Sequence, residues 1–117
     1  MSRQVHGLRA WVLQRFTALY LVLFLAYLLQ RFYTYPVQDF AGWRTWIADP
    51  LVNLTTGLFI LSILIHAWVG VRDVVMDYVR HTGLRVAMFA AIALTLAGCG
   101  LWSLRVLFLA VLRGSVA

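Results

Sequence analysis

The fold of this chain is decided by residues 59–78, which read FILSILIHAWVGVRDVVMDY. This stretch begins as an apolar run suited to a membrane and ends in a charged, aromatic edge. His66 lies inside the apolar part. An ionisable side chain at membrane depth costs free energy, so it is a functional-site candidate by default. The rest of the chain is expected to hold His66 and the pair Asp77 and Tyr78 at fixed depths in a bilayer.

The composition points to a membrane protein. Of the 117 residues, 63% are hydrophobic and 12% are charged, whereas soluble domains have roughly 45–50% apolar and about 25% charged residues. A soluble chain this small could not bury so much apolar surface, which predicts one integral membrane domain over residues 1–117. The net charge of +6 comes from arginines that flank apolar runs, which is typical of topology signals and not of a nucleic-acid groove.

Three apolar segments are long enough to cross a bilayer core, which needs about 20 helical residues. They cover residues 11–30, 51–71 and 84–112, and the second is expected either to end at 71 or to continue as helix to Tyr78. Backbone groups in lipid must be satisfied within the segment, and three spans cannot close a barrel. The predicted fold is therefore an all-α membrane protein with three transmembrane helices.

Two further patterns concern packing. In the first connection, Phe40, Trp43 and Ile47 are spaced i, i+3, i+7, which predicts a short interfacial helix within an aromatic belt. The third span carries small residues that are typical of a helix-packing face, namely Ala87, Ala90, Ala91, Ala93, Ala97, Gly98 and Gly100. The single cysteine, Cys99, allows no intrachain disulfide and is expected to be a small buried packing residue.

Arginine counts predict the orientation of the chain. One side of the membrane would hold Arg3, Arg9, Arg15, Arg72, Arg80 and Arg85, and the other would hold Arg31, Arg44, Arg105 and Arg113. The richer side is expected to be cytoplasmic. The N-terminus and the Asp77–Tyr78 edge would then be inside, and the C-terminus outside.

His66 shares one helix face with other polar and small residues. A helix turns about 100° per residue, which places on that face Thr55, Ser62, His66, Gly70, Asp73 and Asp77. Gly70 would leave a gap for something flat. His66 is either a structural hydrogen-bonding residue between helices or an axial haem ligand. His6 and His81 lie outside the spans, so a second haem ligand would have to come from another chain.

Two other sites have competing interpretations. Arg15 lies about one turn into the first span, where its guanidinium either reaches the headgroups or pairs with a buried anion such as a haem propionate. Tyr78 is either a residue of the aromatic belt or a hydrogen-bond donor to a quinone carbonyl, with Asp77 placed to influence proton delivery.

Several of these residues carry a resemblance to a known family. The stretch LSILIHAWVG at 61–70, the sequence Asp77-Tyr78-Val79, the pair Leu84-Arg85 and the sequence RFTA at 15–18 closely resemble the smaller hydrophobic membrane anchor subunit of bacterial succinate dehydrogenase (respiratory complex II). The resemblance covers all three spans in order. The histidine, tryptophan and glycine of the second span, with the acid and tyrosine beyond it, are its most specific part.

The resemblance implies a function that the chain performs within a complex. In that family, this subunit and a sister three-helix cytochrome b-type subunit anchor a flavoprotein and an iron–sulfur subunit, and each anchor gives one histidine to a shared haem b. His66 matches the haem ligand and Arg15 an arginine near the propionates. Tyr78 matches the tyrosine that hydrogen-bonds ubiquinone, and Asp77 its acidic neighbour.

The sequence is therefore interpreted as a multi-pass anchor of succinate:ubiquinone oxidoreductase in a bacterial inner membrane, without dehydrogenase chemistry of its own. Two alternatives stay open. The same architecture would serve a fumarate reductase, and a cofactor-free helical scaffold would leave His66 as a structural residue.

Overall fold

The computed structural model describes the backbone of residues 2–116 and the side chains of residues 7–113, so the side chains of Arg3 and His6 lie outside the described residues. It contains the helices α1 (Ser2–Thr34), α2 (Phe40–Ala48), α3 (Pro50–Tyr78) and α4 (Thr82–Val116), and no strand occurs in this part of the chain. Three of these helices are long and apolar enough to cross a membrane, at Gly7–Thr34, Pro50–Tyr78 and Thr82–Arg113. The predicted all-α fold with three apolar helices is confirmed.

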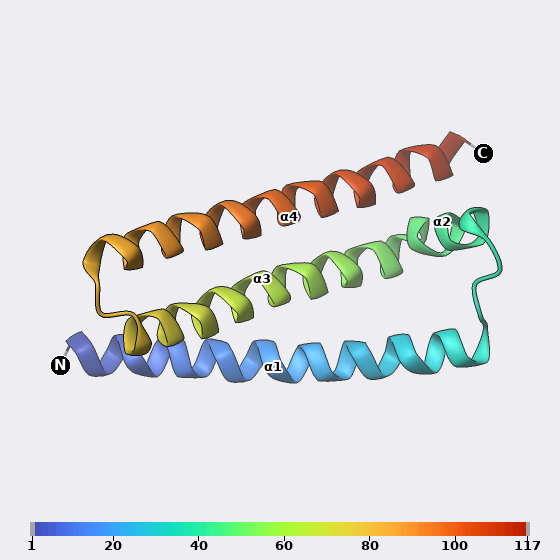
Figure 1. Ribbon diagram of the computed structural model, residues 1–117. Helices are drawn as coiled ribbons and strands as arrows, with labels where there is room; N and C mark the ends of the chain where they lie inside the picture. The colour runs from blue at the N-terminus through green and yellow to red at the C-terminus, as the bar shows by residue number, and fades with distance from the viewer. Residues whose placement is uncertain (1, 117) are drawn as a thin grey trace.

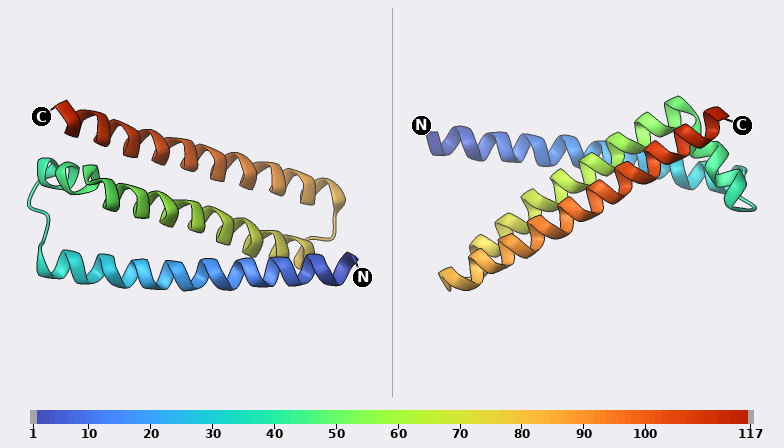
Figure 2. Two further views of the ribbon diagram at one scale, coloured as in Figure 1. Left: turned by 180° about the vertical axis from the view of Figure 1, so that it is seen from behind. Right: turned by 90° about the horizontal axis from the view of Figure 1, so that it is seen from above.

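Helix α3 is the centre of the arrangement. It packs against α1 on one side and against α4 on the other, and α1 and α4 do not contact each other in the described residues (Figure 1). Seen from above, α3 and α4 run side by side while α1 crosses them, so the N-terminal part of α1 diverges from the C-terminal part of α3 (Figure 2). The two chain termini lie at opposite ends of the bundle.

Two aspartates set the helix starts at one end of the bundle. Asp39 accepts a hydrogen bond from the Gly42 N–H at 2.7 Å and caps α2. Asp49 accepts from the N–H groups of Leu51 and Val52 and caps α3, whose first residue is Pro50. Side-chain caps satisfy N–H groups that have no partner within the helix, and proline is favoured at this first position. The predicted short helix in the first connection is therefore present.

The tight connection between α3 and α4 is held by side chains of its own. The Arg85 guanidinium donates to the carbonyl of Val79 at 2.7 Å, just beyond the end of α3. His81 Nδ1 accepts from the N–H of Leu84 at 3.2 Å and caps α4. Arg85 and His81 thus have structural roles at this turn. Those roles explain part of the cluster of polar and charged residues between α3 and α4.

The best-buried apolar cluster lies where α2 meets α4. Ile47 is 2% exposed and packs with Leu107 and Ala110. Asn53 on α3 joins the same region, because its side-chain amide donates to the carbonyls of Ile47 at 3.0 Å and Leu107 at 3.1 Å. One polar side chain therefore connects three helices at the end of the bundle that lies away from His66.

Two packing predictions for α4 need correction. Cys99 is exposed, so the prediction of a buried residue is wrong for this chain. The small-residue strip is a packing face only in part: a Cβ on Gly100 would lie 2.9 Å from Leu64 Cδ1, whereas a Cβ on Gly98 would meet nothing within 4 Å. The reason is that α4 is apolar all round, so its sequence does not reveal which side contacts α3.

Candidate functional site

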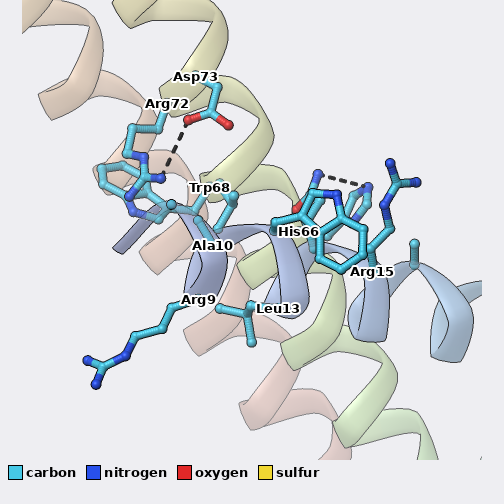
Figure 3. Close-up of a pocket in the computed structure, with 13 residues that line it drawn as sticks. Arg9, Ala10, Leu13, Arg15, His66, Trp68, Arg72 and Asp73 are labelled. Atoms are coloured by element: carbon cyan, nitrogen blue, oxygen red, sulfur yellow. Dashed lines mark hydrogen bonds and ion pairs between the residues drawn. The ribbon is translucent and has the colours of Figure 1, made fainter. Parts of the chain in front are cut away.

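A cavity of about 960 Å³ opens between α1 and α3 where the two helices diverge. It is lined from α1 by Gly7, Arg9, Ala10, Trp11, Leu13, Gln14, Arg15 and Ala18, and from α3 by His66, Trp68, Val69, Arg72 and Asp73 (Figure 3). Its size is near the upper end for ligand sites, which are typically about 300–1,000 Å³. The cavity therefore joins the predicted residues His66 and Arg15 at one place.

The imidazole of His66 is fixed by two side chains of α1. Its Nδ1 lies 3.2 Å from the hydroxyl oxygen of Thr17, and its Nε2 lies 3.5 Å from the amide nitrogen of Gln14. Thr17 is buried, with 7% of its surface exposed. His66 thus faces α1, and farther along the same pair of helices the Tyr20 hydroxyl donates to the backbone carbonyl of Thr55 at 2.7 Å.

Gln14 occupies the space beside Gly70. A Cβ added to Gly70 would lie 3.4 Å from the Gln14 amide nitrogen, so the gap expected at this glycine is filled by a side chain of α1. The oxygen of the same amide is unpaired, because Gln14 Oε1 is buried and has no hydrogen-bond partner among the described residues. An unpaired buried polar atom costs free energy, so it marks Gln14 as a group that gains from a further partner.

The charges around the cavity are mostly positive. The Arg15 guanidinium carbon lies 5.5 Å from the ring centroid of Trp11, in a cation–π contact. Arg72 is paired with Asp73 at 3.4 Å, and the guanidinium of Arg9 points away from His66 (Figure 3). Since Asp73 is the one acid in the lining, the cavity has the electrostatic character of a site for an anionic group.

Asp77 and Tyr78 are at a separate place. They end α3 outside the cavity lining. Tyr78 is 81% exposed, Asp77 is exposed too, and within residues 7–113 neither side chain makes a hydrogen bond. The predicted residues therefore divide into a cavity group, His66 and Arg15, and an exposed edge whose side chains are free to meet another molecule.

Gln14 and Thr17 are the site residues that sequence reasoning missed. The sequence pattern gives no role to Gln14, and Thr17 enters it only within the stretch RFTA at 15–18. The available signal was the three-residue spacing of Gln14, Thr17 and Tyr20, which keeps polar groups on one side of a helix. Their contact with His66 depends on the register between α1 and α3, which helical periodicity does not contain.

The described residues offer too few protein ligands for a bare metal ion. In residues 7–113 no group of three or more His, Cys, Asp and Glu side chains is close enough to hold an ion. A metal at His66 would need ligands from a prosthetic group or from another chain.

Comparison with known proteins identifies what the chain is similar to. The model of the family described as "Succinate dehydrogenase/Fumarate reductase transmembrane subunit" matches residues 1–101. A curated relative, the succinate dehydrogenase hydrophobic membrane anchor subunit of Coxiella burnetii (strain RSA 493 / Nine Mile phase I), is 28% identical over 104 residues. The match covers 89% of this chain and 90% of that protein.

Proposed function

Because the chain belongs to the succinate dehydrogenase/fumarate reductase transmembrane subunit family, it is a membrane anchor subunit of such a complex, and we propose that it shares a haem b and a ubiquinone-reduction site with its partners. The observation that carries the proposal is the imidazole of His66, which lies at membrane depth and borders a large cavity flanked by arginines. The chain supplies ligands and geometry, while succinate oxidation belongs to the soluble subunits.

The cavity residues fit a haem. Neutral imidazole is a suitable iron ligand, and the space beside it is of the right order for a large flat group. The pairing of Arg15 with a propionate is supported by its position in the cavity lining and by the suitability of a guanidinium fork for carboxylates, and Arg9 and Arg72 border the same cavity. The buried, unpaired Gln14 amide oxygen fits a site that holds something more than this chain provides. A haem held by these residues would supply a one-electron redox centre.

The exposed end of α3 fits a quinone site shared with another subunit. The Tyr78 phenol is free to donate a hydrogen bond to a quinone carbonyl, and the Asp77 carboxyl next to it is placed to influence proton delivery. Both side chains are exposed and make no hydrogen bond within residues 7–113, as expected of groups that are completed by a partner and a substrate.

The partners follow from the same proposal. His66 provides one iron ligand, so the second comes from a sister cytochrome b-type anchor subunit. The arginine-rich end of the bundle carries Arg72, Arg80 and Arg85, and by the positive-inside rule it faces the cytoplasm. There it meets the iron–sulfur and flavoprotein subunits. The relative from a bacterium supports a multi-pass location in a bacterial inner membrane.

Two alternatives have support of their own. The family covers fumarate reductase as well as succinate dehydrogenase, and the direction of catalysis depends on cofactor potentials. A cofactor-free anchor is favoured by the contacts of His66 with Thr17 and Gln14, which satisfy the imidazole without iron.

A reduced-minus-oxidised visible spectrum of the detergent-purified complex tests the proposal. The wild-type complex is expected to show a sharp b-type α band, and His66→Ala is expected to abolish or shift it. His81→Ala is the matched control, since His81 caps α4 outside the cavity. A flat wild-type spectrum from an intact complex would remove the haem, and an unchanged band in His66→Ala would remove His66 as its ligand.

A further inference from the structure

The hydroxyl of Thr17 has three close polar neighbours but only one hydrogen to donate. Its oxygen lies 2.8 Å from the carbonyl oxygen of Leu13, 3.0 Å from that of Gln14 and 3.2 Å from His66 Nδ1. A hydroxyl group has one hydrogen to donate and two lone pairs to accept. Carbonyl oxygens only accept, so the hydrogen can serve one of them or the imidazole, but not both.

The hydroxyl hydrogen of Thr17 is donated to a backbone carbonyl of α1 and not to His66. The two carbonyls are the nearer acceptors, and a threonine hydroxyl that donates to the carbonyl four residues earlier is a common arrangement in helices. A lone pair of the hydroxyl oxygen then faces His66 Nδ1. A hydrogen bond across that 3.2 Å gap requires the imidazole to carry its proton on Nδ1.

A neutral imidazole has one ring proton, so a protonated Nδ1 leaves Nε2 with a free lone pair. From this we infer that Thr17 is a positioning residue, which selects the Nδ1–H tautomer of His66 and presents Nε2 as the nitrogen that binds iron. The inference deepens the proposed haem function and rests on it for the identity of the metal. Hydrogen bonds from the second ring nitrogen typically fix the orientation of a histidine ligand and raise its basicity.

The position of Gln14 agrees with this tautomer. Its amide nitrogen is the atom that faces His66 Nε2, at 3.5 Å. An amide nitrogen is a donor only, so it suits a ring nitrogen that carries a lone pair. The same lone pair is the one that a metal would take. Gln14 therefore lies on the Nε2 side of the imidazole, and its side chain would have to turn aside for a metal to bind there.

The tautomer can be read without haem. Nitrogen NMR of the full-length chain with ¹⁵N-labelled histidine, in detergent, distinguishes a protonated from an unprotonated ring nitrogen, and a His66→Ala sample assigns the signals. We expect Nδ1 protonated and Nε2 unprotonated in the wild type and in Thr17→Ser, which keeps the hydroxyl. Thr17→Val, which keeps the shape but not the hydroxyl, is expected to give a mixture. A wild-type His66 protonated on Nε2 would overturn the inference.

The assembled complex gives a second, independent reading. Loss of such an outer hydrogen bond typically lowers metal affinity by about 10–100-fold, so Thr17→Val should weaken haem retention to that extent. Its haem midpoint potential should rise, because a less basic imidazole stabilises ferric iron less. Thr17→Ser should stay close to the wild type in both.

The outcomes separate the two claims. Haem bound through His66 with unchanged affinity and potential in Thr17→Val would refute the role of Thr17 and leave the haem function standing. A wild-type complex without haem would refute the haem function, and the NMR result would still decide the tautomer. If Thr17→Val failed to assemble, the inference would be tested by the protonated ring nitrogen of His66 in the NMR spectra of the wild type and of Thr17→Ser.

Discussion

Asn53 offers a quantitative test of how the end of the bundle away from His66 is held together. Its side-chain amide donates to Ile47 in α2 and to Leu107 in α4, at 3.0 and 3.1 Å. Ile47 lies in the last turn of α2, where carbonyl groups have no partner within the helix. Asn53→Leu keeps the branching and the number of heavy atoms of the side chain but removes both N–H donors, and it leaves the Ile47 carbonyl unpaired beside the best-buried cluster.

The magnitude follows from the two hydrogen bonds. Interhelical bonds in membrane bundles contribute about 0.6 kcal/mol each on average, and bonds in soluble proteins contribute about 0.5–1.5 kcal/mol. Two bonds therefore predict that Asn53→Leu lowers the free energy of unfolding by about 1–3 kcal/mol. The haem spectrum of the complex should not change, since Asn53 is not among the residues that line the His66 cavity.

Unfolding of the purified full-length chain in mixed micelles, by titration with a denaturing detergent and detection by tryptophan fluorescence, measures this difference. Thr95→Val is the matched control. It removes an exposed hydroxyl on α4 whose hydrogen bond goes to Ala91 of its own helix. If Asn53→Leu and Thr95→Val unfolded at the same detergent fraction, the idea that Asn53 connects the three helices would be wrong.

Two further changes test the packing and the exposed edge. Gly100→Leu should cost about 1–3 kcal/mol of stability by overpacking, because even its Cβ would lie 2.9 Å from Leu64 Cδ1, whereas Gly98→Leu has open space and should cost much less in the same unfolding titration. Equal losses would mean that α4 packs with another face. Tyr78→Phe should impair quinone reduction by the complex and spare succinate oxidation with a soluble artificial acceptor. Tyr33→Phe, at an exposed tyrosine in the last turn of α1, should change neither. Loss of both activities in Tyr78→Phe would point to failed assembly.

The helices were predictable from the sequence because a lipid environment allows few backbone conformations. Apolar runs of sufficient length must be helical in a membrane, and the spacing of Phe40, Trp43 and Ile47 gave the short helix α2. The expected polar face of α3 is found only in part. His66 and Gly70 meet side chains of α1, and Tyr20 donates to the backbone carbonyl of Thr55. Asp77, which was expected on the same face, is exposed outside the cavity.

The contacts between helices were less predictable. Periodicity places His66 on a face of its own helix but does not say which residues of α1 stand opposite, so Thr17 and Gln14 were missed. In α4, nearly every position is apolar, so no stripe marks the side that packs. Cys99 and Gly98 therefore lie on the uncovered side although the sequence suggested a buried strip.

The divergence of α1 from α3 has a consequence for the order of assembly. Every residue that lines the His66 cavity belongs to these two helices, and none belongs to α4. Because the ribosome makes α1 first and α4 last, this chain's share of the cavity can be complete in the bilayer before the last span is synthesised. Helix α4 then packs on the other side of α3, away from the cavity.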